Sequence, residues 1–227
     1  MSVEPVLREM RSMADPRAVE GMARFGISSE GTLGLSVPTL RSMARRLGRN
    51  HGLALGLWES GVHEARILAA MVDDPKLVTE SQMERWVRGL DSWDVCDGCC
   101  SELFDKTPFA YAKAVEWSGR REEFVRRAGY ALMAVLAVHD KKVPDSSFLR
   151  FFPEIERGAT DQRNFVKKAV NWALRAIGKR NLKLNREAIR LGRRISKIDS
   201  PSARWVASDA IRELESQAVQ RKVRRSS

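Results

Sequence analysis

The pentapeptide FVRRA at residues 124–128 recurs as FVKKA at residues 165–169, 41 positions further along the chain. Each copy opens a run of apolar residues at helical spacing, Val125–Val138 and Val166–Ile177. One helix pair cannot bury its own apolar face, but a stack of pairs can, and a period of about 40 residues is typical of HEAT-like repeats. The repeat therefore predicts an all-α, HEAT-like helical-repeat solenoid, with a globular helical bundle as the alternative.

Helical patterns also fill most of the remaining chain. Apolar residues recur three and four positions apart over Val3–Met13, Ser36–Leu47, Glu64–Val72 and Arg204–Leu214. A Ser or Thr close before a proline predicts three helix starts: Ser36 with Pro38, Thr107 with Pro108, and Ser200 with Pro201. We expect one solenoid domain over residues 1–220 and a flexible basic tail at residues 221–227.

Basic residues are concentrated in the last third of the chain. The 227 residues carry 40 Lys and Arg and 29 Asp and Glu, a net charge of +11. Residues 161–227 hold 18 basic and 6 acidic side chains, whereas residues 1–100 hold 12 and 14. This asymmetry predicts a polyanionic partner, with a solvated basic face as the alternative. Because helical-repeat stacks curve, we expect a long, concave, basic groove rather than a deep pocket.

The composition disfavours several classes of protein. The apolar run at residues 128–138 is too short to cross a bilayer, which takes about 20 residues, and no apolar leader is visible, so we expect a cytoplasmic protein without membrane contact. Cys96, Cys99 and Cys100 form neither a disulfide framework nor a zinc-finger pattern. Phosphate-loop, dinucleotide and nucleophile-elbow motifs are absent. We therefore expect no metal and no cofactor.

The segment DSWDVCD at residues 91–97 is the most unusual in the sequence. On a helix, Trp93 and Asp97 lie one turn apart on one face, while Asp94 points about 100° away from Trp93. An aromatic ring beside a carboxylate suits a cationic or electron-poor ligand. The alternative is a core tryptophan beside a solvated or capping aspartate.

Three further groups are candidates for ligand contact. Trp172 lies in an apolar helical pattern, where a core position is the alternative, and Phe25 follows Met-Ala-Arg. Arg126 and Arg127 begin a helix whose continuation is nearly uncharged, which suits contact with phosphate. They could instead pair with the acidic residues at 122 and 123. The other four tryptophans (Trp58, Trp86, Trp117 and Trp205) are interpreted as packing residues.

Four segments in this order resemble the AlkD-like DNA alkylation repair family: MARF at 22–25, SWDVCD at 92–97, FVRRA at 124–128 and FVKKAVNWALR at 165–175. The resemblance spans roughly residues 5–215. It implies that Trp93 and Asp97 are catalytic, and it maps the family's arginine to Arg127 and its second aromatic residue to Trp172. The family often has Tyr where this chain has Phe25, so a hydroxyl contact to DNA is lost. The cysteines are not part of the family pattern.

The resemblance implies a monofunctional DNA glycosylase, a HEAT-like enzyme that excises cationic purines of the 3-methyladenine and 7-methylguanine type from duplex DNA. It also implies that the lesion can stay in the duplex, with Trp93 and Trp172 flanking the deoxyribose. An alkylated purine is already a good leaving group, so a carboxylate that stabilises an oxocarbenium-like sugar suffices. A solenoid with one groove needs no second subunit, so we expect a monomer. The expected DNA contacts are Phe25, Arg126, Lys167, Lys168, Arg175, Lys179, Arg180 and Lys183.

Two other functions fit the same residues. One is a non-catalytic HEAT-like protein that binds damaged or branched DNA without releasing a base. The other is a protein-interaction scaffold whose basic face is incidental.

Overall fold

The computed structural model describes residues 2–225, and every regular element in that range is a helix. The all-α prediction is therefore confirmed. The chain forms two compact units, unit 1 up to Pro108 and unit 2 from Phe109 onward. The single domain predicted over residues 1–220 stays a prediction.

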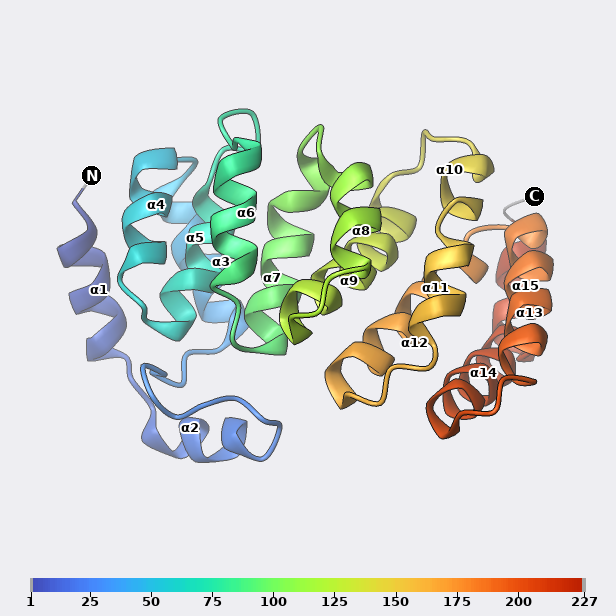
Figure 1. Ribbon diagram of the computed structural model, residues 1–227. Coiled ribbons are helices and arrows are strands. Elements are labelled where there is room, and N and C mark those ends of the chain that lie inside the picture. Colours follow the sequence, from blue (N-terminus) through green and yellow to red (C-terminus); the bar gives the residue numbers. More distant parts are fainter. Residues whose placement is uncertain (1, 226–227) are drawn as a thin grey trace. The chain divides into compact units, whose positions relative to one another are not determined.

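Unit 1 is built around α5, which packs against three other helices of the unit (Figure 1). Its elements are α1 (Val3–Ser12), α2 (Pro16–Ala23), α3 (Val37–Leu47), α4 (His51–Glu59), α5 (His63–Val72), α6 (Glu80–Arg88), α7 (Trp93–Glu102) and the 3₁₀-helix η1 (Phe104–Lys106). Trp58 and Trp86 stack in its core with ring centroids 4.3 Å apart, as expected of packing residues. Helix α2 differs from its neighbours because none of its residues is buried.

Unit 2 contains both copies of the repeated pentapeptide. Its helices are α8 (Ala110–Ser118), α9 (Glu123–His139), α10 (Asp145–Leu149), α11 (Phe152–Gly158), α12 (Asn164–Gly178), α13 (Leu182–Ile195), α14 (Pro201–Leu214) and α15 (Gln217–Arg225). Each copy begins a long helix, and α9 and α12 pack together more extensively than any other pair. The rings of Phe124 and Phe165 lie 5.6 Å apart, so equivalent positions of the repeat meet in space. This arrangement is that of stacked repeats.

Close helix contact in unit 2 depends on a glycine. A Cβ atom at Gly129 of α9 would press against the backbone nitrogen of Ser118 in α8. Only a residue without a side chain lets the two helices approach at this point.

Two of the three predicted helix starts are confirmed. Ser36 accepts a hydrogen bond from the backbone of Thr39, and Ser200 accepts one from Ala203. The start predicted at Thr107 is wrong, because α8 begins at Ala110. The Thr107 hydroxyl is buried and donates to the carbonyl of Phe104 at 2.8 Å, which closes the turn of η1.

The basic tail predicted at residues 221–227 is wrong for residues 221–225, which belong to α15. Val219 and Val223 are buried, and Gln220 donates hydrogen bonds to Asn185 and to the carbonyl of Leu214. These contacts hold α15 against the rest of unit 2, although its basic charge alone suggests a flexible tail. Residues 226 and 227 lie outside the described part of the chain. Within residues 2–225, no helix is both long and apolar enough to cross a membrane.

Candidate functional site

Trp93 and Asp97 lie one turn apart at the start of α7, and both are half-buried. The indole Nε1 of Trp93 donates a hydrogen bond to the carbonyl of Phe25 at 3.1 Å. The start of α7 is thereby joined to the segment that follows α2. The Phe25 side chain is 69% exposed, so a phenyl ring faces solvent from a backbone held at Trp93.

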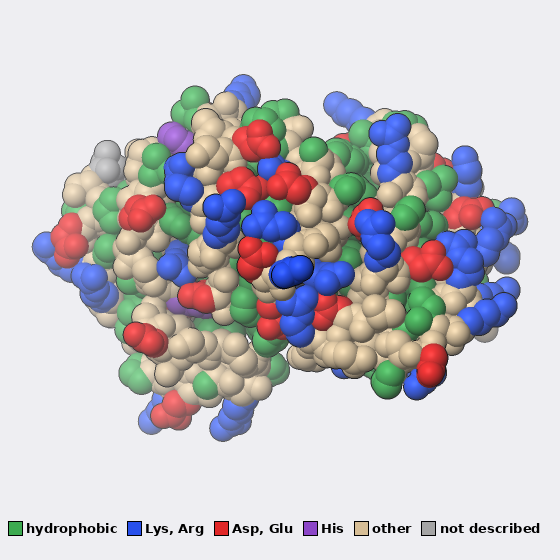
Figure 2. Space-filling model, in the orientation of Figure 1, with side chains coloured by type: hydrophobic (Ala, Val, Ile, Leu, Met, Phe, Trp, Pro, Cys, Tyr) green, Lys and Arg blue, Asp and Glu red, His purple; other side chains and the backbone are tan. Residues whose placement is uncertain are grey.

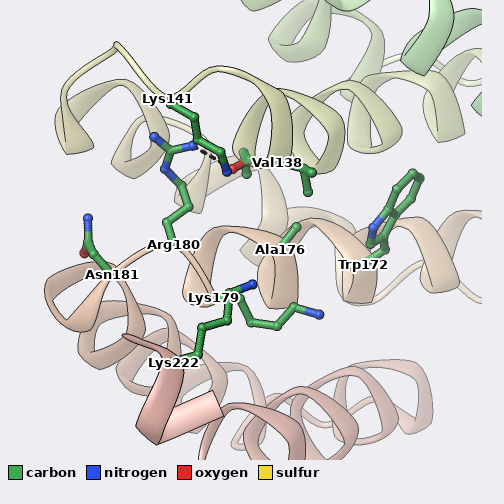
Figure 3. Close-up of a pocket in the computed structure, with 9 residues that line it drawn as sticks. Val138, Lys141, Trp172, Ala176, Lys179, Arg180, Asn181 and Lys222 are labelled. Carbon is green, nitrogen blue, oxygen red and sulfur yellow. Dashed lines mark hydrogen bonds between the residues drawn. The ribbon is translucent and has the colours of Figure 1, made fainter. Parts of the chain in front are cut away.

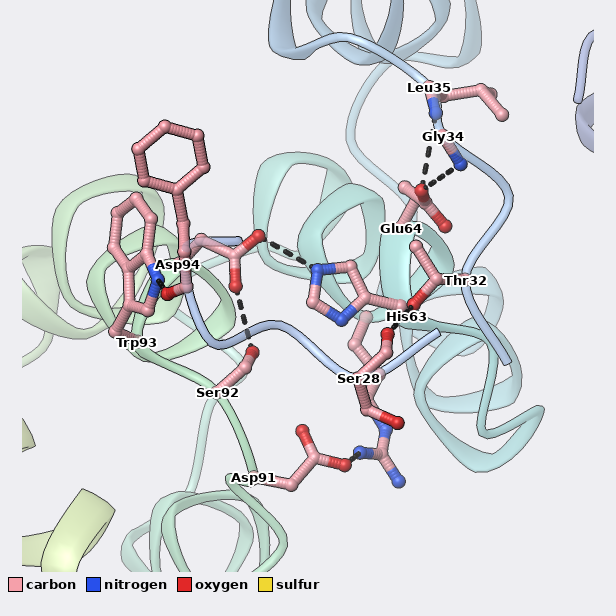
Figure 4. A network of polar contacts seen from close by, with 12 residues as sticks. Ser28, Thr32, Gly34, Leu35, His63, Glu64, Asp91, Ser92, Trp93 and Asp94 are labelled. Atoms are coloured by element: carbon pink, nitrogen blue, oxygen red, sulfur yellow. Dashed lines mark hydrogen bonds and ion pairs between the residues drawn. The ribbon is translucent and has the colours of Figure 1, made fainter. Parts of the chain in front are cut away.

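The other two carboxylates of the same segment are engaged within unit 1 (Figure 4). Asp94 lies 2.8 Å from Nε2 of His63 and accepts a hydrogen bond from the Ser92 hydroxyl at 2.8 Å. Asp91 pairs with Arg66 at 3.0 Å. Asp97 is thus the carboxylate of this segment that shares a helix face with Trp93.

Burial and charge oppose each other in the pair of Asp94 and His63. Burial alone lowers the pKa of His63, but the hydrogen bond and charge of Asp94 raise it above its ordinary value. Burial alone raises the pKa of Asp94, but the hydrogen bond and charge of His63 and the Ser92 hydroxyl lower it. The pair is therefore favoured in its ionised form, which suits a structural ion pair.

Glu64 holds the loop between α2 and α3. Its buried carboxylate accepts backbone hydrogen bonds from Leu33, Gly34 and Leu35 at 2.9, 2.6 and 3.2 Å, two of which appear in Figure 4. Gly34 has a φ of 83°, and a Cβ there would press against the carbonyl of Asp15. Neighbouring residues of α5, His63 and Glu64, therefore fix both the start of α7 and the loop beyond Phe25.

The three cysteines of α7 point into the core of unit 1. Cys96, Cys99 and Cys100 are fully buried. Burial raises the pKa of the Cys99 and Cys100 thiols well above their ordinary value. All three act as small apolar packing groups, and Cys99 and Cys100 are poor nucleophiles.

The paired arginines of unit 2 are both tied into the repeat. Arg127 is 6% exposed and donates to the carbonyl of Phe165 at 2.7 Å, which links α9 to α12. Arg126 pairs with Asp161 at 3.3 Å. Phe165 and Asp161 belong to the neighbouring repeat, so local sequence could not indicate these two contacts.

Trp172 is half-buried on α12 and lines a pocket of about 520 Å³ within unit 2 (Figure 3). Lys141, Lys179, Arg180 and Lys222 line the same pocket. The remaining lining residues are Ala137, Val138, Ala176 and Asn181. Trp172 lies at one end, with Val138 and Ala176 between it and Arg180. Trp172 is therefore not a core residue, because part of its side chain lines this pocket.

Several of the predicted DNA contacts also have partners within unit 2. Arg175 and Lys179 share Glu213, and Lys179 is 2.7 Å from it. Arg180 donates to the carbonyls of Ala137 and Asp140 near the end of α9, where a cation also meets the negative end of the helix dipole.

The remaining predicted cations are more accessible. Lys168 and Lys183 are exposed, and Lys167 lies 5.4 Å over the ring of Trp205. Unit 2 carries 27 basic and 13 acidic residues, a net charge of +14, against −3 for unit 1. Figure 2 shows basic side chains gathered over the end of unit 2 formed by α13 and α15.

Residues 6–214 match the family described as DNA alkylation repair enzyme. The chain belongs to this family. A curated relative, the uncharacterized protein Lin0241 of Listeria innocua serovar 6a, is 21% identical over 194 residues, which is 84% of each chain.

A solved structure has the same fold with a TM-score of 0.77 and 18% identity, over 94% of this chain and 95% of the other. It belongs to "a new family of proteins related to the HEAT-like repeat DNA glycosylases with affinity for branched DNA structures". The HEAT-like fold predicted for this DNA alkylation repair family member is therefore confirmed.

Sequence reasoning missed three features of this family member. Lys141 and Lys222 line the pocket of Trp172, although neither lies in a segment that carries the resemblance. Trp205 is 40% exposed, so its interpretation as a packing residue is wrong. It follows Arg204, which is exposed, and precedes Val206, which is buried, so its helical phase was an available signal.

Proposed function

We propose that this member of the DNA alkylation repair family is a monofunctional DNA glycosylase that excises cationic alkylated purines from duplex DNA. The observation that carries the proposal is the placement of Trp93 and Asp97 on one face of α7, while Asp94 and Asp91 are held by His63 and Arg66. The family match over residues 6–214 supports a role in repair.

The proposed chemistry needs one carboxylate. Alkylation at ring position 3 or 7 makes the purine cationic, and departure of the base leaves positive charge on the anomeric carbon. At a distance of about 4 Å and an effective dielectric near 20, the Asp97 carboxylate would stabilise that charge by roughly 4 kcal/mol. This corresponds to a rate increase of about a thousandfold, which suffices for an activated leaving group.

Trp93 would present its ring to the developing cation, with its indole held by the carbonyl of Phe25. In unit 2 we assign Trp172 the role of the second aromatic residue. Arg127 is assigned to the reaction through the family resemblance, and its bond to Phe165 makes it a rigid support for α9 and α12. Asp97 would also position or activate the attacking water.

Phosphate contacts would supply the affinity for DNA, mainly from the basic surface of unit 2. We assign them to Lys167, Lys168, Arg175, Lys179, Arg180 and Lys183, together with Arg126. Phe25 would contact the DNA through its exposed ring. If six phosphates are neutralised, the logarithm of the binding constant falls with the logarithm of salt concentration at a slope near −5. The protein would act as a cytoplasmic monomer without a cofactor.

The direct test is release of 7-methylguanine from methylated duplex DNA. We expect release by the wild-type protein, at a rate that depends on enzyme concentration. A folded protein that binds the duplex and releases no base would refute the enzymatic proposal.

A second candidate function is binding of branched or damaged DNA without base excision. The solved structure of the same fold belongs to a family with affinity for branched DNA, which is the observation that favours it. Tighter binding to a four-way junction than to methylated duplex, with no base released, would support this alternative.

A further inference from the structure

The pocket of Trp172 combines an aromatic end with a cationic end (Figure 3). Lys141 follows the end of α9, Lys179 is the C-cap of α12, and Lys222 comes from α15. Lysines from three separate segments of unit 2 thus line one pocket. Among the described residues, the lining of this pocket includes no Asp or Glu. Such a convergence of like charges favours an anionic ligand.

Arg180 is a fixed part of the pocket wall. It donates to the carbonyls of Ala137 and Asp140 at 2.6 and 2.7 Å, and its guanidinium lies 4.0 Å over the ring of Phe148. Its charge raises the local potential, while its two carbonyl bonds hold it in place. Lys179 also pairs with Glu213 at 2.7 Å, a contact that a ligand phosphate would replace. Burial, together with the charges of Arg180 and Lys222, lowers the pKa of Lys141. An anion in the pocket would relieve this repulsion.

The dimensions of the pocket indicate a ligand larger than a phosphate group. About 520 Å³ lies within the range of small-molecule sites, roughly 300 to 1,000 Å³. Val138 and Ala176 form an apolar stretch between Trp172 and the cations. A nucleotide has the matching order of parts, which are a flat base, a sugar and a phosphate.

We propose that this pocket binds one unpaired nucleotide of a DNA strand, with its base stacked on Trp172 and its phosphate held by Lys141, Lys179 and Lys222. The proposal rests on the proposed DNA binding but does not require base excision. A paired base has both faces covered by its neighbours in the duplex, so it has no face to offer Trp172. An unpaired base stacks on an aromatic side chain regardless of its identity.

The pocket uses the position of Lys222 on a docked helix and not merely its charge, which makes the proposal testable. Lys222 lies on α15, which is docked through Val219 and Val223, so it presents its charge at a fixed position. Its neighbour Arg221 is exposed and does not line the pocket. Lys142 has the same relation to Lys141. The chain therefore offers a matched control that removes equal charge outside the pocket.

The test compares binding of a flush duplex with that of the same duplex carrying a short unpaired flap. The double variant Lys141→Gln with Lys222→Gln should weaken flap binding by about tenfold and flush-duplex binding much less. The matched control, Lys142→Gln with Arg221→Gln, should leave the preference for the flap unchanged. Unfolding midpoints verify that all variants are folded. Equal loss of flap binding in both double variants would overturn the proposal.

A second measurement reports on the base. With 2-aminopurine as the unpaired base, binding to the wild-type protein should quench its fluorescence through stacking on Trp172, and Trp172→Ala should abolish the quenching and weaken binding by about tenfold. Unchanged quenching in Trp172→Ala would exclude this site.

Flap binding through these residues without release of 7-methylguanine would refute the glycosylase proposal alone. If the protein releases 7-methylguanine and the pocket variants bind the flap as tightly as wild type does, the pocket proposal alone is refuted.

Discussion

The carboxylate of Asp94 lies 2.8 Å from Nε2 of His63, a histidine that is only 7% exposed. This ion pair gives Asp94 a structural role that the sequence pattern does not indicate. Asp94 anchors α7 to α5, whereas Asp97 shares the face of Trp93. The division of roles leads to the first two predictions.

The variant Asp97→Asn should lower the rate of 7-methylguanine release by at least about tenfold, because it removes the charge that stabilises the sugar cation. Its affinity for duplex DNA should be nearly unchanged. Asp91→Asn is the control, since Asp91 is exposed and pairs with Arg66 of α5. Single-turnover rates and duplex binding measure the two effects. An unaltered rate would remove Asp97 from its assigned role.

The ion pair of Asp94 and His63 makes the stability of the protein depend on pH. The folded-state pKa of His63 is raised above 6.5, so its contribution is complete below pH 6.5 and is lost as pH rises through the folded value. The lowered pKa of Asp94 gives a contribution that is present above pH 3.8 and is lost as pH falls through its folded value. The free energy of unfolding should therefore decline as pH rises above 6.5.

The variant His63→Gln should flatten that decline and lower the free energy of unfolding by about 1–3 kcal/mol near pH 6. Urea denaturation at a series of pH values measures both effects. His139→Gln, which changes an exposed histidine, should keep the wild-type pH profile. A profile of His63→Gln that is identical to wild type would contradict the assigned ion pair.

Arg127→Gln should destabilise unit 2, because it loses a charged donor to the buried carbonyl of Phe165. We expect a loss of about 1–3 kcal/mol in the free energy of unfolding. Arg121→Gln is a suitable comparison, since Arg121 is exposed just before the same helix. Denaturant titrations of the three proteins give the difference. Equal stability of Arg127→Gln and wild type would show that the bond contributes nothing measurable to the fold.

Phe25→Ala should weaken binding to DNA by about tenfold without lowering the unfolding midpoint. The ring is 69% exposed, so its removal leaves no cavity, and the backbone carbonyl that holds Trp93 is kept. Leu77→Ala, which truncates another exposed apolar residue of unit 1, should leave both quantities unchanged. Fluorescence anisotropy with a duplex and thermal unfolding provide the measurements. Wild-type affinity in Phe25→Ala would exclude its ring from the DNA contact.

Local sequence determined the class of fold and much of its detail. The apolar spacing after residues 124 and 165 predicted α9 and α12, because helical periodicity and capping are set by neighbours in sequence. The same holds for the starts at Ser36 and Ser200. The start predicted at Thr107 is wrong because Thr107 belongs to the turn of η1, where its hydroxyl donates to the Phe104 carbonyl, and α8 begins at Ala110.

In the candidate site, too, local sequence indicates some contacts and misses those made by helices distant in the chain. The pattern of residues 91–97 indicated Trp93 and Asp97, since side chains four apart share a helix face whatever surrounds them. That Asp94 pairs with His63 depends on α5, 31 residues earlier in the chain. Likewise, Lys141 and Lys222 line one pocket although 81 residues separate them.

The sequence by itself thus determined the helix starts at Ser36 and Ser200, which residues repeat, and which side chains share a helix face. Only the tertiary structure decided which of these faces are covered, so that Trp117 is buried and Trp205 is 40% exposed. It also decided that residues 221–225 form a docked helix rather than a basic tail. The reason is that burial and ion pairing depend on helices distant in sequence, whereas periodicity and capping depend on residues only a few positions apart.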